Sequence, residues 1–308
     1  MSVIMRLKLS DLRNEREWRA MVGLDRKRFE QLLKYFKDIY LEINHCSLEE
    51  KLPKETLHRY CIKNEEDLLF FTLASAKCGN TYDQIGIFFG MDASNAKRNQ
   101  EKGLTLLEKI LEKFGYLPKR NTMNKEEFIQ LFSTLESLII DVTEQRITRP
   151  SDGEIQRDYY SGKKKAHTVK TLIIASEEKK ILYLSNCFTG KTHDYAILKS
   201  LLNPTEEDWF ENHHIKVDLG FQGIAKNYGC KKLSIPHKKP PKKELTLEQK
   251  RENQRMASER IVVEQSISGL KRYRILSERL RTQSLDFYNK ILGVCAGLWN
   301  FYLSFSFL

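Results

Sequence analysis

Apolar residues recur at helical spacing in the first part of the chain. The segment "NEEDLLFFTLASAKCGN", residues 64–80, opens with an asparagine that suits a helix cap and continues with acids. Leu68, Phe71 and Ala76 then follow the helical repeat until Gly79 ends it. The pattern predicts a helix over this segment.

A short helix, a glycine turn and a second helix are predicted directly after it. Thr81 is placed to cap the short helix, and "GMD", residues 90–92, forms the turn. The second helix begins near Ala93 and exposes small polar and basic residues, namely Ser94, Asn95, Lys97, Arg98 and Asn99. This order is typical of a DNA-binding helix-turn-helix, and a plain helical hairpin gives the same pattern.

The pattern changes after residues 113–136, where Gly, Pro and mixed charge indicate a linker between two domains. Beyond the linker the pattern predicts three strands, at residues 137–147, 164–176 and 179–190. A short helix at 193–202, a strand at 213–218 and the final helices are predicted to follow. We therefore expect a helical domain over residues 1–112, with the helix-turn-helix near 64–103. A mixed α/β domain is expected over residues 137–308.

The last apolar stretch, residues 291–308, contains no charged residue. Its length is close to the minimum that a membrane-spanning helix needs. Asn300, Ser304 and Ser306 interrupt it, and two glycines weaken it. We expect a buried helix or strand of the core, or a contact between subunits, in preference to a membrane span.

Composition adds a strong positive charge to this picture. The net charge of the 308 residues is +11, and residues 226–281 hold 16 Lys and Arg against 6 Glu. Such a concentration suits binding to a polyanion such as nucleic acid, and a block of solvated lysines gives the same count.

The six cysteines are scattered, with no paired spacing. This argues against a zinc site or a disulfide scaffold and fits a reducing cytosol. The first residues contain no apolar stretch long enough for a signal peptide. We expect a cytoplasmic protein.

Two aspartates stand where strands usually carry apolar side chains. Asp141 follows the apolar run 138–140, and Asp218 follows 215–217. A carboxylate in such a position costs free energy unless a cation or hydrogen bond compensates for it. The alternative is an aspartate that caps a turn at the end of a strand.

A third acid lies on a helix predicted over residues 258–274. Arg260, Glu264 and Lys271 share one side of it, directly beside the apolar stripe of Val263, Ile267 and Leu270. A solvated helix would carry its charges opposite that stripe. The simplest interpretation is a surface ion pair between Arg260 and Glu264. The other is that the carboxylate points into a cleft.

Carboxylates that converge from two strands and a helix suit two magnesium ions, because Mg²⁺ prefers oxygen ligands. Two such ions, roughly 3.5–4 Å apart, support in-line displacement at phosphorus. The chain shows no glycine-rich phosphate loop. A metal-dependent phosphoryl transfer therefore fits the residues.

The chain resembles the bacterial insertion-sequence DDE transposases, in the group similar to Harbinger-type elements. The motifs that carry the resemblance are "IIDVTE", "YYSGKKKAHTVK", "GKTHDYAIL", "DLGFQG" and "RIVVEQSISGLKRYRIL". The resemblance implies a ribonuclease H-like catalytic domain in which Asp141, Asp218 and Glu264 are catalytic. It also implies that Arg260 and Lys271 contact DNA near the cleaved end.

Further basic and polar residues are candidates for supporting roles. Clustered lysines carry charge without the geometry for reading bases, so we expect phosphate contacts from Lys163, Lys164 and Lys165. The basic loop before the last helices is expected to help bind the terminal inverted repeats through Lys238, Lys239, Lys242 and Lys243. Asp194, after His193, is interpreted either as a helix cap or, with His193, as support for the metal ligands.

The sequence thus predicts a DNA transposase that uses two Mg²⁺ ions, with Mn²⁺ as a substitute. Its expected partners are the terminal inverted repeats and target DNA, both double-stranded, at the nucleoid. Pairing of two element ends implies a homodimer or a larger assembly. The alternatives are a catalytically silent DNA-binding descendant and a nuclease of the same fold without strand transfer.

Overall fold

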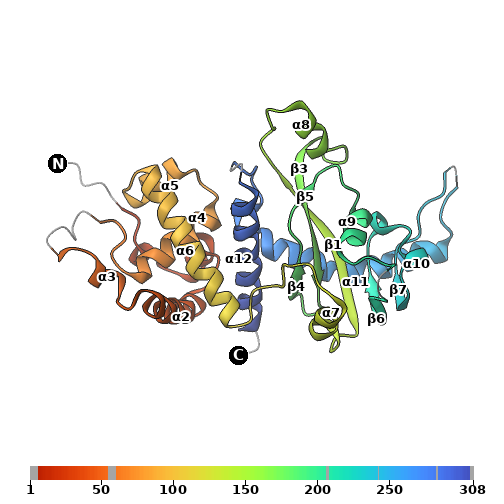
Figure 1. Ribbon diagram of the computed structural model, residues 1–308, viewed down its shortest axis with the longest axis horizontal. Coiled ribbons are helices and arrows are strands. Elements are labelled where there is room, and N and C mark those ends of the chain that lie inside the picture. The colour runs from red at the N-terminus through yellow and green to blue at the C-terminus, as the bar shows by residue number, and fades with distance from the viewer. Residues whose placement is uncertain (1–5, 55–59, 206–207, 242, 282–283, 306–308) are drawn as a thin grey trace. The chain divides into compact units, whose positions relative to one another are not determined.

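The structure is a computed structural model that describes residues 6–54, 60–205, 208–241, 243–281 and 284–305. It divides into two compact units (Figure 1). A helical unit comprises residues 1–117, 270–278 and 286–308, and a mixed α/β unit comprises residues 118–269 and 279–285. The candidate acids Asp141, Asp218 and Glu264 all belong to the α/β unit.

The described elements of the helical unit are helices. They are η1 (Leu9–Asp11), α1 (Glu15–Val22), α2 (Arg26–Asn44), α3 (Leu48–Lys51), α4 (Glu65–Cys78), α5 (Tyr82–Phe89), α6 (Ala93–Lys113), η4 (Arg274–Leu276) and α12 (Leu285–Ser304). Helix α4 is the centre of this unit, since every residue from Leu68 to Ala76 is buried. Helices α1, α2 and α6 pack around it.

The helix boundaries predicted around α4, α5 and α6 are confirmed. Asn64 caps α4 by accepting a hydrogen bond from the Asp67 amide, and Gly79 ends that helix in the left-handed conformation. Thr81 caps α5 in a reciprocal capping box with Gln84. Asp92 caps α6 after the predicted glycine turn.

The C-terminal stretch forms α12, and its residues from Ile291 to Phe301 are buried. Ser306 lies outside the described residues. No helix in the described part of the chain is long and apolar enough to span a membrane. Helix α12 belongs to the same compact unit as the N-terminal helices, whereas the sequence pattern predicts that residues 137–308 form a single α/β domain. The difference arises because apolar side chains of α12 pack against residues that are distant in sequence.

The α/β unit is built on one mixed sheet. Its strands are β1 (Ser137–Arg146), β2 (Tyr160–Ser161), β3 (Ala166–Ala175), β4 (Ile181–Leu184), β5 (Phe188–Thr189), β6 (Phe210–Lys216) and β7 (Cys230–Ser234). The main order is β2-β3-β1-β6-β7, with β4 and β5 also paired to β3. Strand β1 is antiparallel to β3 and parallel to β6, and β7 is parallel to β6.

The helices of this unit are α7 (Lys125–Phe132), α8 (Gly153–Tyr159), α9 (Asp194–Leu201), η3 (Leu219–Phe221), α10 (Ile224–Asn227) and α11 (Leu247–Lys271). One face of the sheet, which includes Leu138 and Ile140 of β1, packs with α7, α9 and α10 in a single apolar core. Residues at alternate positions, including Ile139 and Asp141, point to the opposite face. Helix α11 contacts that face through Arg260.

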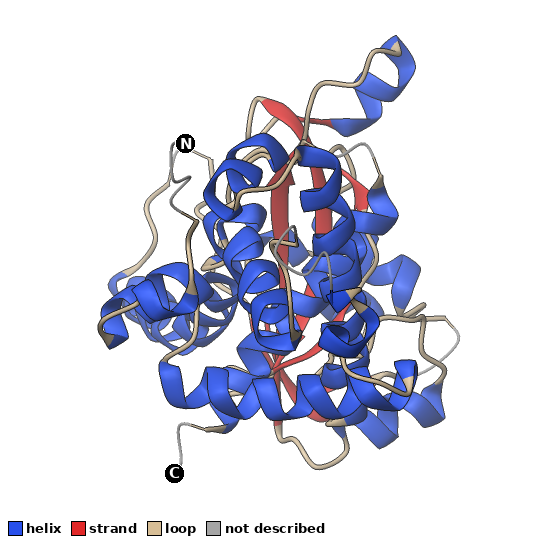
Figure 2. Ribbon diagram, turned by 90° about the vertical axis from the view of Figure 1, so that its left-hand side faces the viewer, coloured by secondary structure: helices blue, strands red, loops and turns tan. Residues whose placement is uncertain are grey.

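Several elements of this unit are missing from the sequence prediction, namely β2, β7 and α10 and the two helices α7 and α8. Helix α7 lies inside the segment assigned to a linker, and its Phe128 and Phe132 are buried in the core. Helix α8 falls in a segment for which the sequence pattern gives no element, and it packs near β3. Figure 2 shows α8 at the top, beyond the end of the long strands. Short helices with mixed charge carry a weak periodic signal.

We expect Gly103→Ala to lower the stability of the protein. A Cβ at Gly103 of α6 would stand 1.8 Å from Thr72 Oγ1, and Thr72 is fully buried with its hydroxyl bonded to the Leu68 carbonyl. Overpacking of this kind lowers the free energy of unfolding by about 1–3 kcal/mol. Urea unfolding measures the change.

The matched control is Gly153→Ala in α8, where no atom lies within 4 Å of the added Cβ. That variant is expected to stay near the wild-type stability. Adding Thr72→Ala to Gly103→Ala should recover part of the loss. Equal stability of the two single alanine variants would contradict the close packing of α4 and α6.

Candidate active site

The register of two parallel strands brings two aspartates together. Ile139 of β1 pairs with Lys216 of β6, so Asp141 and Asp218 each lie two residues beyond the same matched pair. Parallel strands place equivalent residues side by side on one edge of the sheet. The negative charge of Asp218 accordingly acts on the pKa of Asp141.

Asp218 also caps a turn. Its Oδ1 accepts a hydrogen bond of 2.7 Å from the Gly220 amide, which starts the 3-10 turn η3. A Cβ at Gly220 would stand 2.8 Å from Asp218 Oδ1 and 2.9 Å from Asp194 Oδ2. The glycine therefore allows the carboxylates of Asp218 and Asp194 to lie next to each other.

Asp194 is held by a lysine from the sheet. Its Oδ1 lies 2.9 Å from the Nζ of Lys170, and both side chains are mostly buried. Lys170 also donates to the Thr192 carbonyl at 2.8 Å. The residue that caps α9 is His193, whose Nδ1 accepts from the Tyr195 amide, and Asp194 is the first residue of the helix. The cap interpretation of Asp194 is therefore wrong, because its carboxylate faces Lys170 and Gly220.

Helix α11 brings a cation to the first aspartate. Arg260 Nη2 lies 3.7 Å from Asp141 Oδ2, and each side chain is only 17% exposed. The Nε of Arg260 is buried without a hydrogen-bond partner among the described residues. Glu264, one helical turn further along α11, is exposed.

The environment of Asp141 disfavours its ionised form. Burial is the largest cause and raises the pKa of its carboxyl to about 6, with further increases from the charges of Asp218 and Asp194. The Val142 amide, which donates to Asp141 Oδ1 at 2.7 Å, and the Arg260 guanidinium lower that pKa in part. A further cation beside Asp141 would therefore be favourable.

Across the described ranges, no three His, Cys, Asp or Glu side chains converge closely enough to hold a metal ion. Asp218 and Asp194 both lie next to Gly220, and their charges act on Asp141, whereas Glu264 is exposed on α11. The donor set at the strand ends consists of carboxylate oxygens, which are the ligands that Mg²⁺ and Mn²⁺ accept.

The candidate basic residues of this unit lie in turns and loops. Lys163, Lys164 and Lys165 are exposed in the turn between β2 and β3. In the loop between β7 and α11, Lys238 donates to Gln222, Lys239 pairs with Glu244, and Lys243 is exposed. Lys242 lies outside the described residues. Lys271 is the last residue of α11 and groups with the helical unit.

In the helical unit, α6 exposes the polar face predicted for it. Ser94, Asn95, Lys97 and Arg98 are exposed, and Asn99 is half-buried. Arg98 donates to Asn95 at 2.8 Å, and Lys97 lies 3.8 Å from Glu101. These pairs are weak enough for both cations to remain available to a partner.

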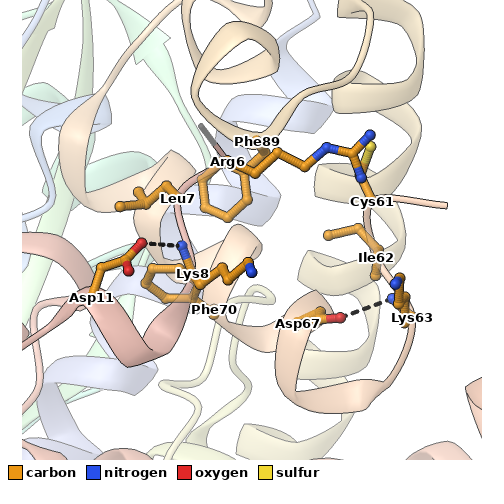
Figure 3. A pocket seen from close by; sticks show the side chains of 10 residues that line it. All are labelled: Arg6, Leu7, Lys8, Asp11, Cys61, Ile62, Lys63, Asp67, Phe70 and Phe89. Carbon is orange, nitrogen blue, oxygen red and sulfur yellow. Dashed lines mark hydrogen bonds between the residues drawn. The ribbon is translucent and has the colours of Figure 1, made fainter. Parts of the chain in front are cut away.

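A hollow of about 500 Å³ in the same unit lies beside the turn before α6 (Figure 3). Its polar lining includes Arg6, Lys8 and Lys63, and its acids Asp11 and Asp67 accept hydrogen bonds from backbone amides of the hollow itself. None of the acids on the sheet lines it. It is therefore separate from the candidate active site.

Comparison with known proteins agrees with this arrangement. The family model described as "DDE superfamily endonuclease" matches residues 140–300. The chain is 30% identical over 294 residues to a protein of Microchaete diplosiphon named as the probable transposase for insertion sequence element IS702, which covers 94% of this chain and 95% of that protein. No solved structure matches the chain.

The chain therefore belongs to the DDE superfamily endonucleases and, within them, to the insertion-sequence DDE transposases. The family match begins one residue before Asp141 and ends near the end of α12. It thus covers the strands, the acids and the helix α11 described above.

Replacing Asp141 by Asn is expected to stabilise the metal-free protein above neutral pH. The pKa of Asp141 is about 6 in the folded chain and about 3.9 in an unfolded one, so the folded state binds the proton more tightly. Its contribution to stability is complete below pH 4 and is lost as pH rises through 6. Urea unfolding in a chelator should show Asp141→Asn to be more stable than wild type by about 1–3 kcal/mol at pH 8.

At pH 4 the difference in stability is expected to be small, because Asp141 is then protonated in the folded state and about half protonated in the unfolded state. Asp286→Asn, which removes an exposed acid of α12, is the control and should show no such pH dependence. A lower stability of Asp141→Asn at pH 8 would show that the Arg260 ion pair outweighs the burial of the charge.

Proposed function

We propose that this protein is a DNA transposase that cuts the ends of an insertion element and joins them to target DNA. The observation that carries the proposal is that Asp141 and Asp218 each lie two residues beyond a matched pair of parallel strands, with Arg260 of α11 at 3.7 Å from Asp141. Such carboxylates are the usual ligands of metal ions in enzymes that transfer phosphoryl groups. The family membership supports the same reaction class.

The sheet order supports a ribonuclease H-like catalytic fold. Three strands, β1, β3 and β4, form an antiparallel meander, and β6 and β7 extend it in parallel beyond β1. The first acid then lies on the central strand and the second after its parallel neighbour. The third acid, Glu264, comes from the helix that follows the sheet in sequence.

In this proposal Asp141, Asp218 and Glu264 hold two Mg²⁺ ions, for which Mn²⁺ substitutes. When bound, the ions activate the attacking oxygen and stabilise the leaving oxygen at phosphorus. The chain's own contribution is the placement of the oxygen ligands. The two strand acids lie together before any ion arrives, and Glu264 faces the solvent from which ions and DNA approach.

The cations of this unit bind and orient the DNA backbone. Arg260 lies beside Asp141, and Lys271, the last residue of the same helix, belongs to the helical unit and contributes a further cation. Lys163 to Lys165 and the loop lysines Lys238, Lys239, Lys242 and Lys243 extend the positive charge. Arg260 neutralises the phosphate that reacts, and the lysines bind neighbouring phosphates without selecting sequence.

The helical unit recognises the terminal inverted repeats through α6. Its exposed residues Ser94, Asn95, Lys97 and Arg98 suit a helix that lies in the major groove. The joining of two element ends requires two copies of this unit, so the active assembly is at least a dimer. His193 and Asp194 support the acids by fixing the start of α9 beside Gly220.

Cleavage of a labelled duplex that carries the element's own end tests the catalytic part of the proposal. With Mg²⁺ the wild type is expected to nick the end, and Glu264→Gln should reduce the rate by more than about 100-fold. Binding of the same duplex should be retained by the variant. Glu248→Gln, which changes an exposed acid in the first turn of α11, is the control and should cut normally.

Joined donor–target product would separate a transposase from a nuclease without strand transfer. Tight binding by wild type and Glu264→Gln, with cutting by neither, would reject catalysis and leave a DNA-binding protein. Nicking that persists in Glu264→Gln would reject Glu264 as a metal ligand.

A second test concerns recognition by α6. Arg98→Ala is expected to weaken binding to the element's end by about 1–3 kcal/mol while binding to a scrambled duplex changes little, because base contacts carry the sequence preference. Lys109→Ala, at an exposed position later in α6, is the control. An equal loss on both duplexes would show that Arg98 contacts only phosphates.

A further inference from the structure

Lys216 is a buried cation that none of the proposed chemistry uses. It is the last residue of β6, and its side chain is only 9% exposed. Its Nζ donates to Glu177 Oε1 at 2.8 Å and lies 3.4 Å from Glu259 Oε2. Glu177 belongs to the turn between β3 and β4, and Glu259 belongs to α11. One lysine therefore joins three separate elements.

The lysine is held in its charged form. Burial alone would lower the pKa of the Lys216 ammonium, but the hydrogen bond and charge of Glu177 and the charge of Glu259 raise that pKa above its ordinary value. A buried charge is retained only when such partners compensate for lost hydration. The two carboxylates within 3.4 Å of its Nζ make Lys216 the centre of an ion-pair network.

The network stands next to both strand acids. Lys216 pairs with Ile139 across β6 and β1, and two residues further along these strands come Asp218 and Asp141. On the helix, Glu259 directly precedes Arg260, which lies 3.7 Å from Asp141. The same two strands and the same helix thus make two adjacent ionic contacts.

A second polar contact ties α11 to the same turn. Ser266 Oγ donates to the Lys179 carbonyl at 3.0 Å, and Lys179 follows Glu177 by two residues. Glu259 and Ser266 are thus two positions at which α11 is attached to β6 and to the turn before β4, whereas Asn253, nearer the start of the helix, bonds His237 of the preceding loop. Arg260 and Glu264 lie between Glu259 and Ser266.

Apolar packing gives α11 little other means of fixing its position. Among the described residues its fully buried apolar side chains are Val263 and Leu270, whereas Leu247 is 76% exposed and Ile261 is 46% exposed. Met256, Val262 and Ile267 are half-buried. A helix with so narrow an apolar contact can rotate or shift with little loss of burial. Buried polar contacts are the interactions that specify one register among such alternatives.

We propose that Lys216 is a positioning residue that fixes the register of α11 over β6 through Glu259, so that Arg260 lies against Asp141 and Glu264 is held one turn further along the helix. This inference rests on the proposed cleavage function for its effect on rate. The fixing of the helix itself is independent of that function.

The test compares Lys216→Met, Lys216→Arg and wild type as full chains. Hydrogen exchange of the α11 amides from Glu259 to Ser266 is expected to become at least about tenfold faster in Lys216→Met, and exchange in α9 should stay unchanged. The rate of Mg²⁺-dependent nicking at saturating DNA should fall about 10–100-fold, because small displacements of catalytic groups are costly. The dissociation constant for DNA should change less than about twofold.

Lys216→Arg keeps the charge and should restore both the exchange pattern and most of the rate. Lys231→Met is the matched control, since Lys231 on neighbouring β7 forms an exposed ion pair with Glu136 at 3.5 Å. If Lys216→Met folds poorly, Glu259→Gln removes only the helix side of the network and should give the same local increase in exchange.

Wild-type exchange in α11 of both Lys216→Met and Glu259→Gln would overturn the inference. So would a uniform increase across the α/β unit that Lys216→Arg does not correct, since that result indicates general loss of stability. If the wild type fails to cut DNA, the proposed function fails. The exchange measurement then still decides whether Lys216 fixes α11.

Discussion

The burial of one carboxylate, that of Asp141, constrains the rest of the α/β unit. Asp141 pairs with Ile173 of β3 on one side, and on the other side the pairing of β1 with β6 ends two residues earlier, at Ile139. Its charge needs compensation from groups at the sheet face or beyond the end of β6. Arg260 approaches from the face, on α11. This ion pair constrains the position of α11 on the sheet. In our proposal the contacts of Glu259 with Lys216 and of Ser266 with Lys179 fix that position.

The charges around Asp141 are unequal in number. Asp141, Asp218 and Asp194 bring three carboxylates to the strand ends, and the cations paired with them are Arg260 and Lys170. Burial and the neighbouring acids together raise the pKa of Asp141, so the site favours additional positive charge. In the proposed function this additional positive charge is supplied by metal ions. The exposed position of Glu264 leaves access for an ion and for DNA phosphates.

Local signals made the helix caps and the two strand acids predictable. Asn64, Thr81 and the glycine turns act on their nearest neighbours, and an aspartate inside an apolar run is conspicuous in any sequence. The contacts of Lys170 and Lys216 were not predicted, although Lys216 stands in an equally apolar run between Ile215 and Val217. Their partners lie far away in the chain, and only the strand register brings them together. Helix α7 was not predicted for the same reason, because its buried side chains pack against a sheet whose strands come later in the sequence.

The register also explains why the third acid comes from a helix. Two parallel neighbours, β1 and β6, bring Asp141 and Asp218 to one place, but the residue opposite Asp141 on β3 is Ile173, which is fully buried. A charge there would face the same desolvation cost without a partner. A helix crossing the sheet face can instead present a cation and an acid from the same side, because residues four apart are separated by only about 40°. Arg260 and Glu264 have this spacing, with Arg260 against Asp141 and Glu264 exposed, so in the proposed function one helix supplies both the compensating charge and the third acid.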